Sequence, residues 1–221
     1  MIAIVDAGLG NLRSVEKALR AVGADVVVTA QAAVIRRADR VVVPGQGAFG
    51  DCGRVLSREA PLGQAVLESI ALGKPYLGIC LGLQILFETS EEAPGCKGLG
   101  VLRGRVQRIP DGLPDGAGGR LKVPHMGWNP IRASARPHPI LAATYAALQH
   151  TEERPAIPFY FVHSYHALPS EPFLVEATAS YGDMAITAAV AARNVFAVQF
   201  HPEKSQAAGL AMMRAFLEWQ C

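Results

Sequence analysis

The sequence lacks the cysteine pattern of a disulfide framework or a zinc site. Only four cysteines occur in 221 residues, at positions 52, 80, 96 and 221, and their spacing matches neither paired bridges nor metal ligands. We therefore expect free thiols, no metal site and a reducing compartment, for which the cytoplasm is the simplest choice.

Long hydrophobic runs and an excess of charge are absent as well. The first apolar segment, residues 1–5, stops at Asp6, so we expect no signal peptide. The longest apolar stretches are too short and too interrupted to span a bilayer. A formal net charge of +2 provides no basic field for nucleic acid. The length and the apolar content fit one catalytic domain over residues 1–221.

The apolar pattern predicts an α/β fold. Short β-branched runs at residues 3–5, 26–28, 41–43 and 75–79 alternate with helical periodicity over residues 15–22 and 62–70. This alternation is typical of an open, mostly parallel sheet with helices on both faces. Shorter segments over 101–108, 159–162, 174–179 and 185–192 predict an antiparallel extension, followed by a helix over 206–220 with Leu210, Met213 and Leu217 on one face. Residues 110–119 predict an exposed, mobile loop.

Cys80 lies between an apolar strand and the start of a helical segment, within Gly78-Ile79-Cys80-Leu81-Gly82. A strand that turns at once into a helix holds the residue at the bend in a strained conformation, and flanking glycines remove clashing side chains. The helix N-terminus also favours a thiolate. A small core cysteine is the alternative, but a core position requires neither glycine. The pattern predicts a nucleophile with a lowered pKa.

A base for this nucleophile is available late in the chain, at Phe200-His201-Pro202-Glu203. The preceding run, residues 195–200, has the composition of a buried strand, so His201 lies at a strand end. Glu203 could hold its imidazole in the productive tautomer. A surface turn is the alternative for His-Pro-Glu alone. Together with Cys80, the motif predicts a Cys-His-Glu triad.

An oxyanion site is predicted at Pro44-Gly45-Gln46-Gly47, which follows the strand at residues 41–43. Gly45 and Gly47 would let a backbone N–H turn toward a developing negative oxygen. The N–H of Leu81, directly after the nucleophile, is the natural second donor. An ordinary glycine-rich loop is the alternative.

These three motifs, in this order, resemble the class I (triad) glutamine amidotransferases. Further segments resemble the branch of that family formed by the glutaminase subunits of imidazole glycerol phosphate synthase. They are residues 6–14 (DAGLGNLRS), 123–129 (VPHMGWN), 159–165 (FYFVHSY) and 199–205 (QFHPEKS). The chain departs from the family's usual residues at Ala7, Gln46 and Ala197.

The resemblance implies hydrolysis of glutamine by Cys80, His201 and Glu203, with ammonia passed to a cyclase subunit in a heterodimer. That complex has lyase activity in histidine biosynthesis. It implies a glutamine pocket lined by Gln84 and by His163-Ser164-Tyr165, the latter mostly through backbone. No cofactor is implied, and Gly8-Leu9-Gly10 lacks the third glycine of a dinucleotide motif.

The resemblance also implies a partner interface. Its residues would be Asn11, Trp128, Tyr160 and Lys204. Each has a plainer alternative: Asn11 as a helix N-cap, Trp128 as a core aromatic, Tyr160 as a strand aromatic and Lys204 as a solvated lysine. The remaining histidines, at positions 125, 138, 150 and 166, are interpreted as packing or surface residues.

Three other functions stay open at this point. Another triad amidotransferase, such as the glutaminase of anthranilate synthase, would share the triad, although residues 6–14 and 123–129 argue against it. A stand-alone γ-glutamyl cysteine hydrolase would be active without a partner. A catalytically silent binding module is disfavoured, because Cys80, His201 and Glu203 are all present.

Overall fold

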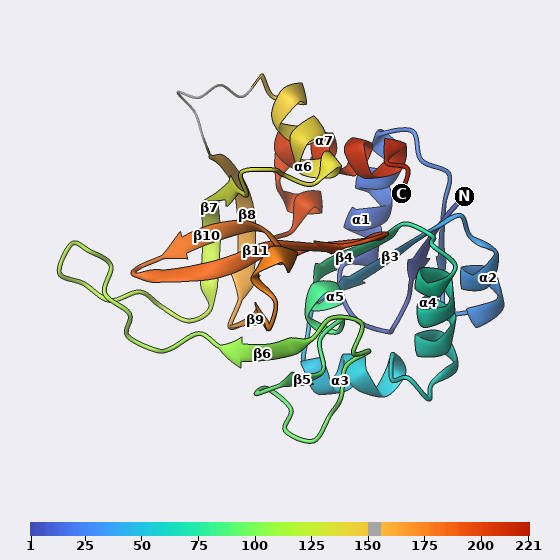
Figure 1. Ribbon diagram of the computed structural model, residues 1–221, viewed down its shortest axis with the longest axis horizontal. Helices are drawn as coiled ribbons and strands as arrows, with labels where there is room; N and C mark the ends of the chain where they lie inside the picture. The colour runs from blue at the N-terminus through green and yellow to red at the C-terminus, as the bar shows by residue number, and fades with distance from the viewer. Residues whose placement is uncertain (150–155) are drawn as a thin grey trace.

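A mixed sheet with nine strands among the described residues runs through the centre of the protein (Figure 1). The structure is a computed structural model that describes residues 1–149 and 156–221. The strand order is β2-β1-β3-β4-β12-β11-β10-β7-β8. The first five strands in this order are parallel: β2 (Val26–Thr29), β1 (Ile2–Val5), β3 (Arg40–Gly45), β4 (Tyr76–Cys80) and β12 (Val195–Val198).

Three of the remaining four strands confirm the predicted antiparallel extension. They are β11 (Met184–Ala192), β10 (Val175–Tyr181) and β8 (Ile157–His163). The fourth strand, β7 (His125–Ala133), was not predicted. The extension therefore joins the parallel half at β12, the strand that leads to His201.

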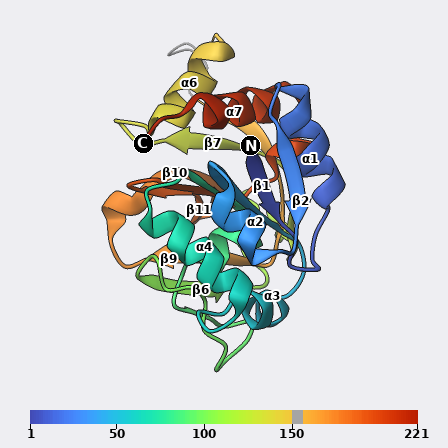
Figure 2. The same ribbon diagram turned by 90° about the vertical axis from the view of Figure 1, so that its right-hand side faces the viewer.

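Helices cover both faces of the sheet, as the alternating pattern predicts (Figure 2). Ile2 and Ile4 face one core, which contains side chains of α1 (Leu12–Ala21), α6 (Pro139–Ala147) and α7 (Gln206–Glu218). Ala3 and Val5 face the other core, which contains side chains of α2 (Ala32–Arg37), α3 (Phe49–Val55), α4 (Pro61–Ala71) and α5 (Leu81–Gln84). Successive strand residues point to opposite faces, so β1 must be apolar throughout to fill both cores.

One part of the predicted extension is wrong. The segment at residues 101–108 forms β6 (Gly104–Arg108), which belongs to a separate sheet with β5 (Thr89–Ser90) and β9 (Tyr165–Pro169). Here β6 pairs antiparallel with β9, and Arg108 lies opposite Tyr165. Pairing between segments about sixty residues apart leaves no trace in local periodicity. This small sheet matters because β9 begins at the wall of the candidate site.

The last helix, α7, also differs in detail from its prediction. Leu210 is 39% exposed, whereas Met212 and Phe216 are fully buried beside Met213. Leu210 stands four residues from both Gln206 and Arg214, so it shares their exposed face, and a core stripe through Leu210 was the wrong choice of face.

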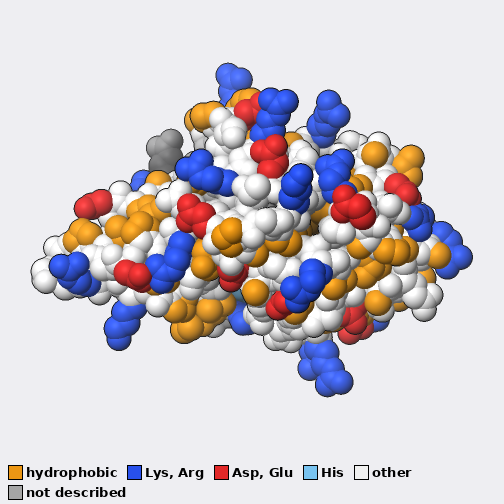
Figure 3. Space-filling model, turned by 90° about the horizontal axis from the view of Figure 1, so that it is seen from below, with side chains coloured by type: hydrophobic (Ala, Val, Ile, Leu, Met, Phe, Trp, Pro, Cys, Tyr) orange, Lys and Arg blue, Asp and Glu red, His pale blue; other side chains and the backbone are white. Residues whose placement is uncertain are grey.

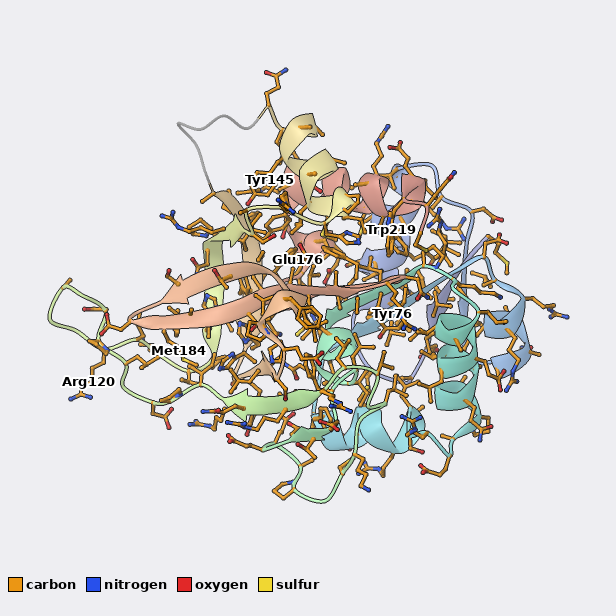
Figure 4. The ribbon with its side chains drawn as sticks, in the orientation of Figure 1. Tyr76, Arg120, Tyr145, Glu176, Met184 and Trp219 are labelled. Atoms are coloured by element: carbon orange, nitrogen blue, oxygen red, sulfur yellow. The ribbon has the colours of Figure 1, made fainter. Side chains whose placement is uncertain are left out.

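The segment between β6 and β7 contains the predicted exposed loop, and the mobility of that loop stays a prediction. Its Asp115 side chain accepts hydrogen bonds from the N–H groups of Ala117 and Gly119. Figure 4 shows Arg120 projecting at the far end of the molecule, beyond Met184 at the start of β11. The loop thus lies at the tip of the antiparallel extension.

No helix in residues 1–149 or 156–221 is long and apolar enough to cross a membrane. On the face seen from below in Figure 3, positive and negative side chains are interspersed rather than gathered into one basic stripe. This distribution agrees with the small net charge of +2.

Candidate active site

Cys80 is the last residue of β4, and its backbone confirms the predicted bend. Its φ of 54° and ψ of −103° lie in a region that non-glycine residues rarely occupy. The flanking glycines are needed for close packing. A Cβ on Gly78 would lie 2.4 Å from the carbonyl oxygen of Gly82, and one on Gly82 would lie 1.7 Å from that of Val43. The sequence therefore fixes a sharp strand-to-helix turn at the sulfur.

The helix that follows Cys80 is shorter than expected. α5 spans only Leu81–Gln84, and the chain leaves the helix before Phe87. Residues 81–87 are all buried, a pattern that suits a buried turn as well as a longer buried helix, so the pattern does not tell where the helix ends. One turn has only a small macrodipole. Neighbouring side chains therefore affect the electrostatic environment of the Cys80 sulfur more than the dipole of α5 does.

His201 reaches the same region from the neighbouring strand, because β12 pairs in parallel with β4 and Val198 lies opposite Ile79. Its Nδ1 lies 2.8 Å from Oε1 of Glu203, and both side chains are only 2% exposed. Burial alone would lower the pKa of His201, but interactions with Cys80 and Glu203 outweigh it and raise the pKa to about 9. The ring Nε2 makes no formed hydrogen bond among the described residues. It is nevertheless near enough to the thiol for Cys80 to influence this pKa.

Gln199 is a neighbour of the sulfur that the sequence interpretation missed. It is fully buried, and its Nε2 donates to Sγ of Cys80 at 3.5 Å. Its Oε1 accepts from Nε2 of Gln84 at 3.1 Å. The available signal was a glutamine inside an otherwise apolar, buried strand run, since a buried amide needs hydrogen-bond partners.

The predicted oxyanion segment lies directly beside the nucleophile, with Gly45 opposite Cys80 in the β3–β4 register. The two glycines have different roles. Gly47 has a φ of 124°, which favours glycine, whereas a Cβ on Gly45 would come within 2.6 Å of the Leu81 Cβ. The expectation that both glycines provide conformational freedom is therefore supported only at Gly47.

A cavity of about 360 Å³ opens at the sulfur. It is lined by the predicted residues Gly47, Cys80, Leu81, Gln84, His163, Ser164 and Tyr165, and also by Gln46, Glu92, Val162 and Lys204. Gly45 does not line it. Glu92 was missed, because it lies in a polar turn after β5 with no motif around it. Its Oε2 accepts from the N–H of Phe49 at 2.7 Å, which holds the carboxylate at the cavity.

Three of the four predicted interface residues lie together. The Tyr160 ring lies 6.2 Å from the Trp128 ring and 5.8 Å from Nζ of Lys204. Trp128 is 49% exposed, so its interpretation as a core aromatic is wrong. Asn11 is exposed and accepts a hydrogen bond from the N–H of Ser14, which confirms its N-cap role. Lys204 both contacts Tyr160 and lines the cavity.

The other histidines differ in their surroundings. His125 is buried and bonded to His163, so it is more than a packing residue. His138 accepts from the N–H of Ile140 and stacks on Phe196, as a packing residue does. His166 is fully buried, and His150 lies outside the described residues.

Within residues 1–149 and 156–221, no group of three or more potential metal-binding side chains forms a site. The four cysteines are free. Burial raises the pKa of Cys52 to about 12. The structure places a thiol, an imidazole and a carboxylate beside a small cavity.

Comparison with known proteins finds a matching family model and similar sequences. The family model described as "Glutamine amidotransferase class-I" matches residues 3–219. A protein of Methylococcus capsulatus named "Imidazole glycerol phosphate synthase subunit HisH" is 49% identical over 99% of this chain and 96% of its own length. A protein of the same name from Aromatoleum aromaticum is 48% identical over 99% and 98%.

Two solved structures share the fold at low sequence identity. One, titled "Crystal structure of glutamine amidotransferase", has a TM-score of 0.69 at 20% identity and covers 98% of this chain and 97% of its own. A glutaminase domain of Trypanosoma brucei CTPS with bound acivicin has a TM-score of 0.63 at 16% identity and covers 100% and 94%.

Proposed function

We propose, on the premise that this chain belongs to the class I glutamine amidotransferase family, that it is the glutaminase subunit of imidazole glycerol phosphate synthase. The observation that carries the activity is Cys80 in a strained bend beside the buried His201–Glu203 pair. The assignment to imidazole glycerol phosphate synthase rests on the 48–49% identity to two subunits of that enzyme over 99% of this chain. The proposal places the protein in the cytoplasm, in histidine biosynthesis, as one chain of a heterodimer with a cyclase subunit.

The first half of the reaction uses the sulfur. The thiolate of Cys80 attacks the side-chain amide carbon of glutamine, and the carbonyl oxygen becomes negatively charged in the tetrahedral intermediate. Backbone N–H groups at Gly47 and Leu81 stabilise that oxygen. His201, protonated because its pKa is raised, gives its proton to the leaving nitrogen, and ammonia departs as the thioester forms.

The second half restores the enzyme. Neutral His201 now accepts a proton from a water molecule, whose oxygen attacks the thioester carbon. Collapse of the intermediate breaks the carbon–sulfur bond and releases glutamate. The thiolate and the protonated imidazole are then present again. Glu203 keeps Nδ1 protonated throughout, so that Nε2 alone exchanges protons with the substrate.

Charges at the cavity suit an amino acid. Glu92 supplies a carboxylate for the α-ammonium group, and Lys204 supplies an ammonium for the α-carboxylate. Gln84 lines the pocket, as the resemblance implied, but its Nε2 already donates to Oε1 of Gln199 and to the carbonyl oxygen of Tyr165. Only its Oε1 stays available to the substrate.

The decisive test replaces the nucleophile within the complex. Cys80→Ala, copurified with a tagged cyclase subunit, should lose glutamine-dependent synthesis while synthesis from added ammonium salt persists, because the acceptor site lies on the other chain. Cys96→Ala is the matched control and should keep both activities. Retained glutaminase activity in Cys80→Ala would overturn the assignment of the nucleophile. Full activity of the isolated wild-type chain would instead favour the stand-alone hydrolase.

A further inference from the structure

A chain of hydrogen bonds that the proposed mechanism does not use runs from β7 to the cavity wall. Asn129 on β7 donates from Nδ2 to the carbonyl oxygen of Ser180 at 2.8 Å, and the same Nδ2 lies 3.1 Å from Nε2 of His125. Nδ1 of His125 lies 2.9 Å from Nε2 of His163. Nδ1 of His163 lies 2.8 Å from the carbonyl oxygen of Tyr165. Four bonds thus connect two backbone carbonyls through two imidazole rings.

The chemistry of the two ends fixes the direction of every bond. A carbonyl oxygen only accepts, so Nδ1 of His163 must carry a proton, and Nε2 of this neutral ring must accept. His125 therefore donates from Nδ1, and its Nε2 accepts from the amide of Asn129. Starting from the carbonyl of Ser180 gives the same assignment, because that oxygen requires the Asn129 amide nitrogen rather than its oxygen. Both rings must be neutral Nδ1–H tautomers.

Burial keeps both rings neutral. His125 is 3% exposed and His163 is 6% exposed. Burial lowers the pKa of His125 to about 4, and burial together with nearby His125 lowers that of His163 to about 3. The His125 ring is also held by aromatic neighbours, with Phe161 stacked at 4.8 Å and Tyr181 at 4.2 Å. The network therefore has one proton arrangement at neutral pH.

The same Tyr165 carbonyl leads onward to the sulfur. It accepts a second hydrogen bond from Nε2 of Gln84 at 2.9 Å. Gln84 also donates to Gln199, which donates to Cys80. One carbonyl oxygen thus joins the histidine pair to the hydrogen bonds around the nucleophile, and its residue lines the cavity.

We propose that His125 and His163 are positioning residues, which hold the Ser164–Tyr165 wall of the glutamine pocket and connect it to β7. Between His125 and Asn129 on the same strand lie Met126 and Trp128, which are 61% and 49% exposed. A partner bound to Met126 and Trp128 would contact β7, the strand that carries the His125 ring. The inference rests on the proposed function, since the wall belongs to the same pocket.

Two substitutions of His163 separate positioning from packing. His163→Asn can place an amide N–H near the former Nδ1 and donate to the Tyr165 carbonyl, although it leaves unfilled space. His163→Phe fills the space but donates nothing. If His163 positions the pocket wall, His163→Phe should raise KM for glutamine about 10-fold or more, with a smaller fall in kcat, and His163→Asn should stay closer to wild type. If His163 only fills space, His163→Asn should raise KM more than His163→Phe does.

The experiment measures glutamine-dependent and ammonium-dependent synthesis by the complex with the cyclase. Copurification of each variant with the tagged cyclase subunit shows that the chain folds and docks. Ammonium-dependent synthesis, which uses the acceptor site on the other chain, shows that the cyclase in each preparation is active. Equal KM values for Asn and Phe, or a lower KM for Phe, would overturn the inference. If wild type itself fails with glutamine, the proposed function fails instead.

A second measurement needs no variant. Nitrogen NMR of the wild-type complex labelled in histidine should show His125 and His163 as neutral Nδ1–H tautomers at neutral pH. A ring protonated at Nε2 in either residue would overturn the assigned directions, and with them the inference. His125→Asn and His125→Phe should repeat the order of effects seen at His163, with smaller changes in KM, because the hydrogen bond from His125 reaches the wall through His163.

Discussion

His201 and His163 are both almost completely buried near Cys80, yet their pKa values move in opposite directions. Burial disfavours the charged form of each ring. For His163, whose partners are a carbonyl and a neutral imidazole, the pKa falls to about 3. For His201, a carboxylate and a thiol outweigh burial and raise the pKa to about 9. The bonded partners, rather than the depth of burial, decide whether a histidine here carries charge.

The largest effect should come from making the same substitution at both histidines. We expect His201→Asn to lower kcat for glutamine hydrolysis by about 10⁴-fold or more, because an amide cannot give a proton to the leaving nitrogen. His163→Asn should stay within a small factor of wild type, since it keeps one hydrogen bond. Steady-state kinetics of the complex with the cyclase measures both. Comparable losses in the two variants would remove the distinction between a proton carrier and a positioning ring.

A smaller effect is expected when the charged partner of His201 is made neutral. Glu203→Gln keeps the shape but removes the carboxylate, so burial should prevail and the pKa of His201 should fall from about 9. We expect kcat to fall by roughly 10²- to 10⁴-fold, through the lost charge and a misplaced tautomer. NMR titration of the His201 ring checks the direction of the shift. A pKa that stays near 9 would show that Cys80 alone sustains it.

Cysteine labelling extends the comparison from the rings to the thiols. A limiting amount of iodoacetamide at neutral pH should modify Cys80 before Cys52, by about 10-fold or more in rate, since burial raises the pKa of Cys52 to about 12. Cys96 and Cys221 should also react after Cys80. Mass spectrometry of the partly labelled protein gives the order. His201→Asn is the control and should remove the advantage of Cys80.

The smallest effect concerns stability against pH. For His125 and His163, the folded-state pKa values of about 4 and 3 lie below the ordinary value of 6.5, so the unfolded chain binds more protons between these limits. Stability should therefore fall as the pH drops below 6.5, by up to about 1.4 kcal/mol per pH unit for each ring. His201 acts oppositely, and its contribution is lost as the pH rises from 6.5 toward 9.

Urea unfolding of the wild type and of His125→Phe, from neutral pH down to about pH 5, measures this slope. His138 and His166, whose pKa values burial also lowers to about 4, keep their contributions in both proteins. The free energy of unfolding of His125→Phe should therefore fall less steeply than that of the wild type as the pH drops. Identical slopes would contradict a neutral His125 in the folded state.

Much of the fold was predictable because the parallel half is built from local signals. Each run such as residues 41–43 is short, β-branched and followed by a helical period, and parallel strands must end at a common edge. The position of Cys80 at that edge followed directly. The separate sheet of β5, β6 and β9 was not predictable, because its pairs join distant segments. The short α5 was missed because apolar residues on all sides suit a buried turn as well as a helix.

In the candidate site, motif residues were predictable and supporting residues were not. Cys80, His201 and Glu203 stand in recognisable local sequences, and the structure brings them together. Glu92 and the pairing of His125 with His163 depend on loop and strand packing, which sequence spacing does not encode. A polar residue within an apolar run, such as Gln199, is a sequence signal that could have identified one of these supporting residues.

The backbone of Cys80 has a consequence for protein engineering. A non-glycine residue at φ 54° and ψ −103° costs roughly 1–3 kcal/mol, which Cys80→Gly should largely recover. The substitution would raise the melting temperature and leave no sulfur to attack glutamine. A library screened for thermal resistance alone would therefore enrich inactive chains at this position, so selection must couple stability to histidine prototrophy.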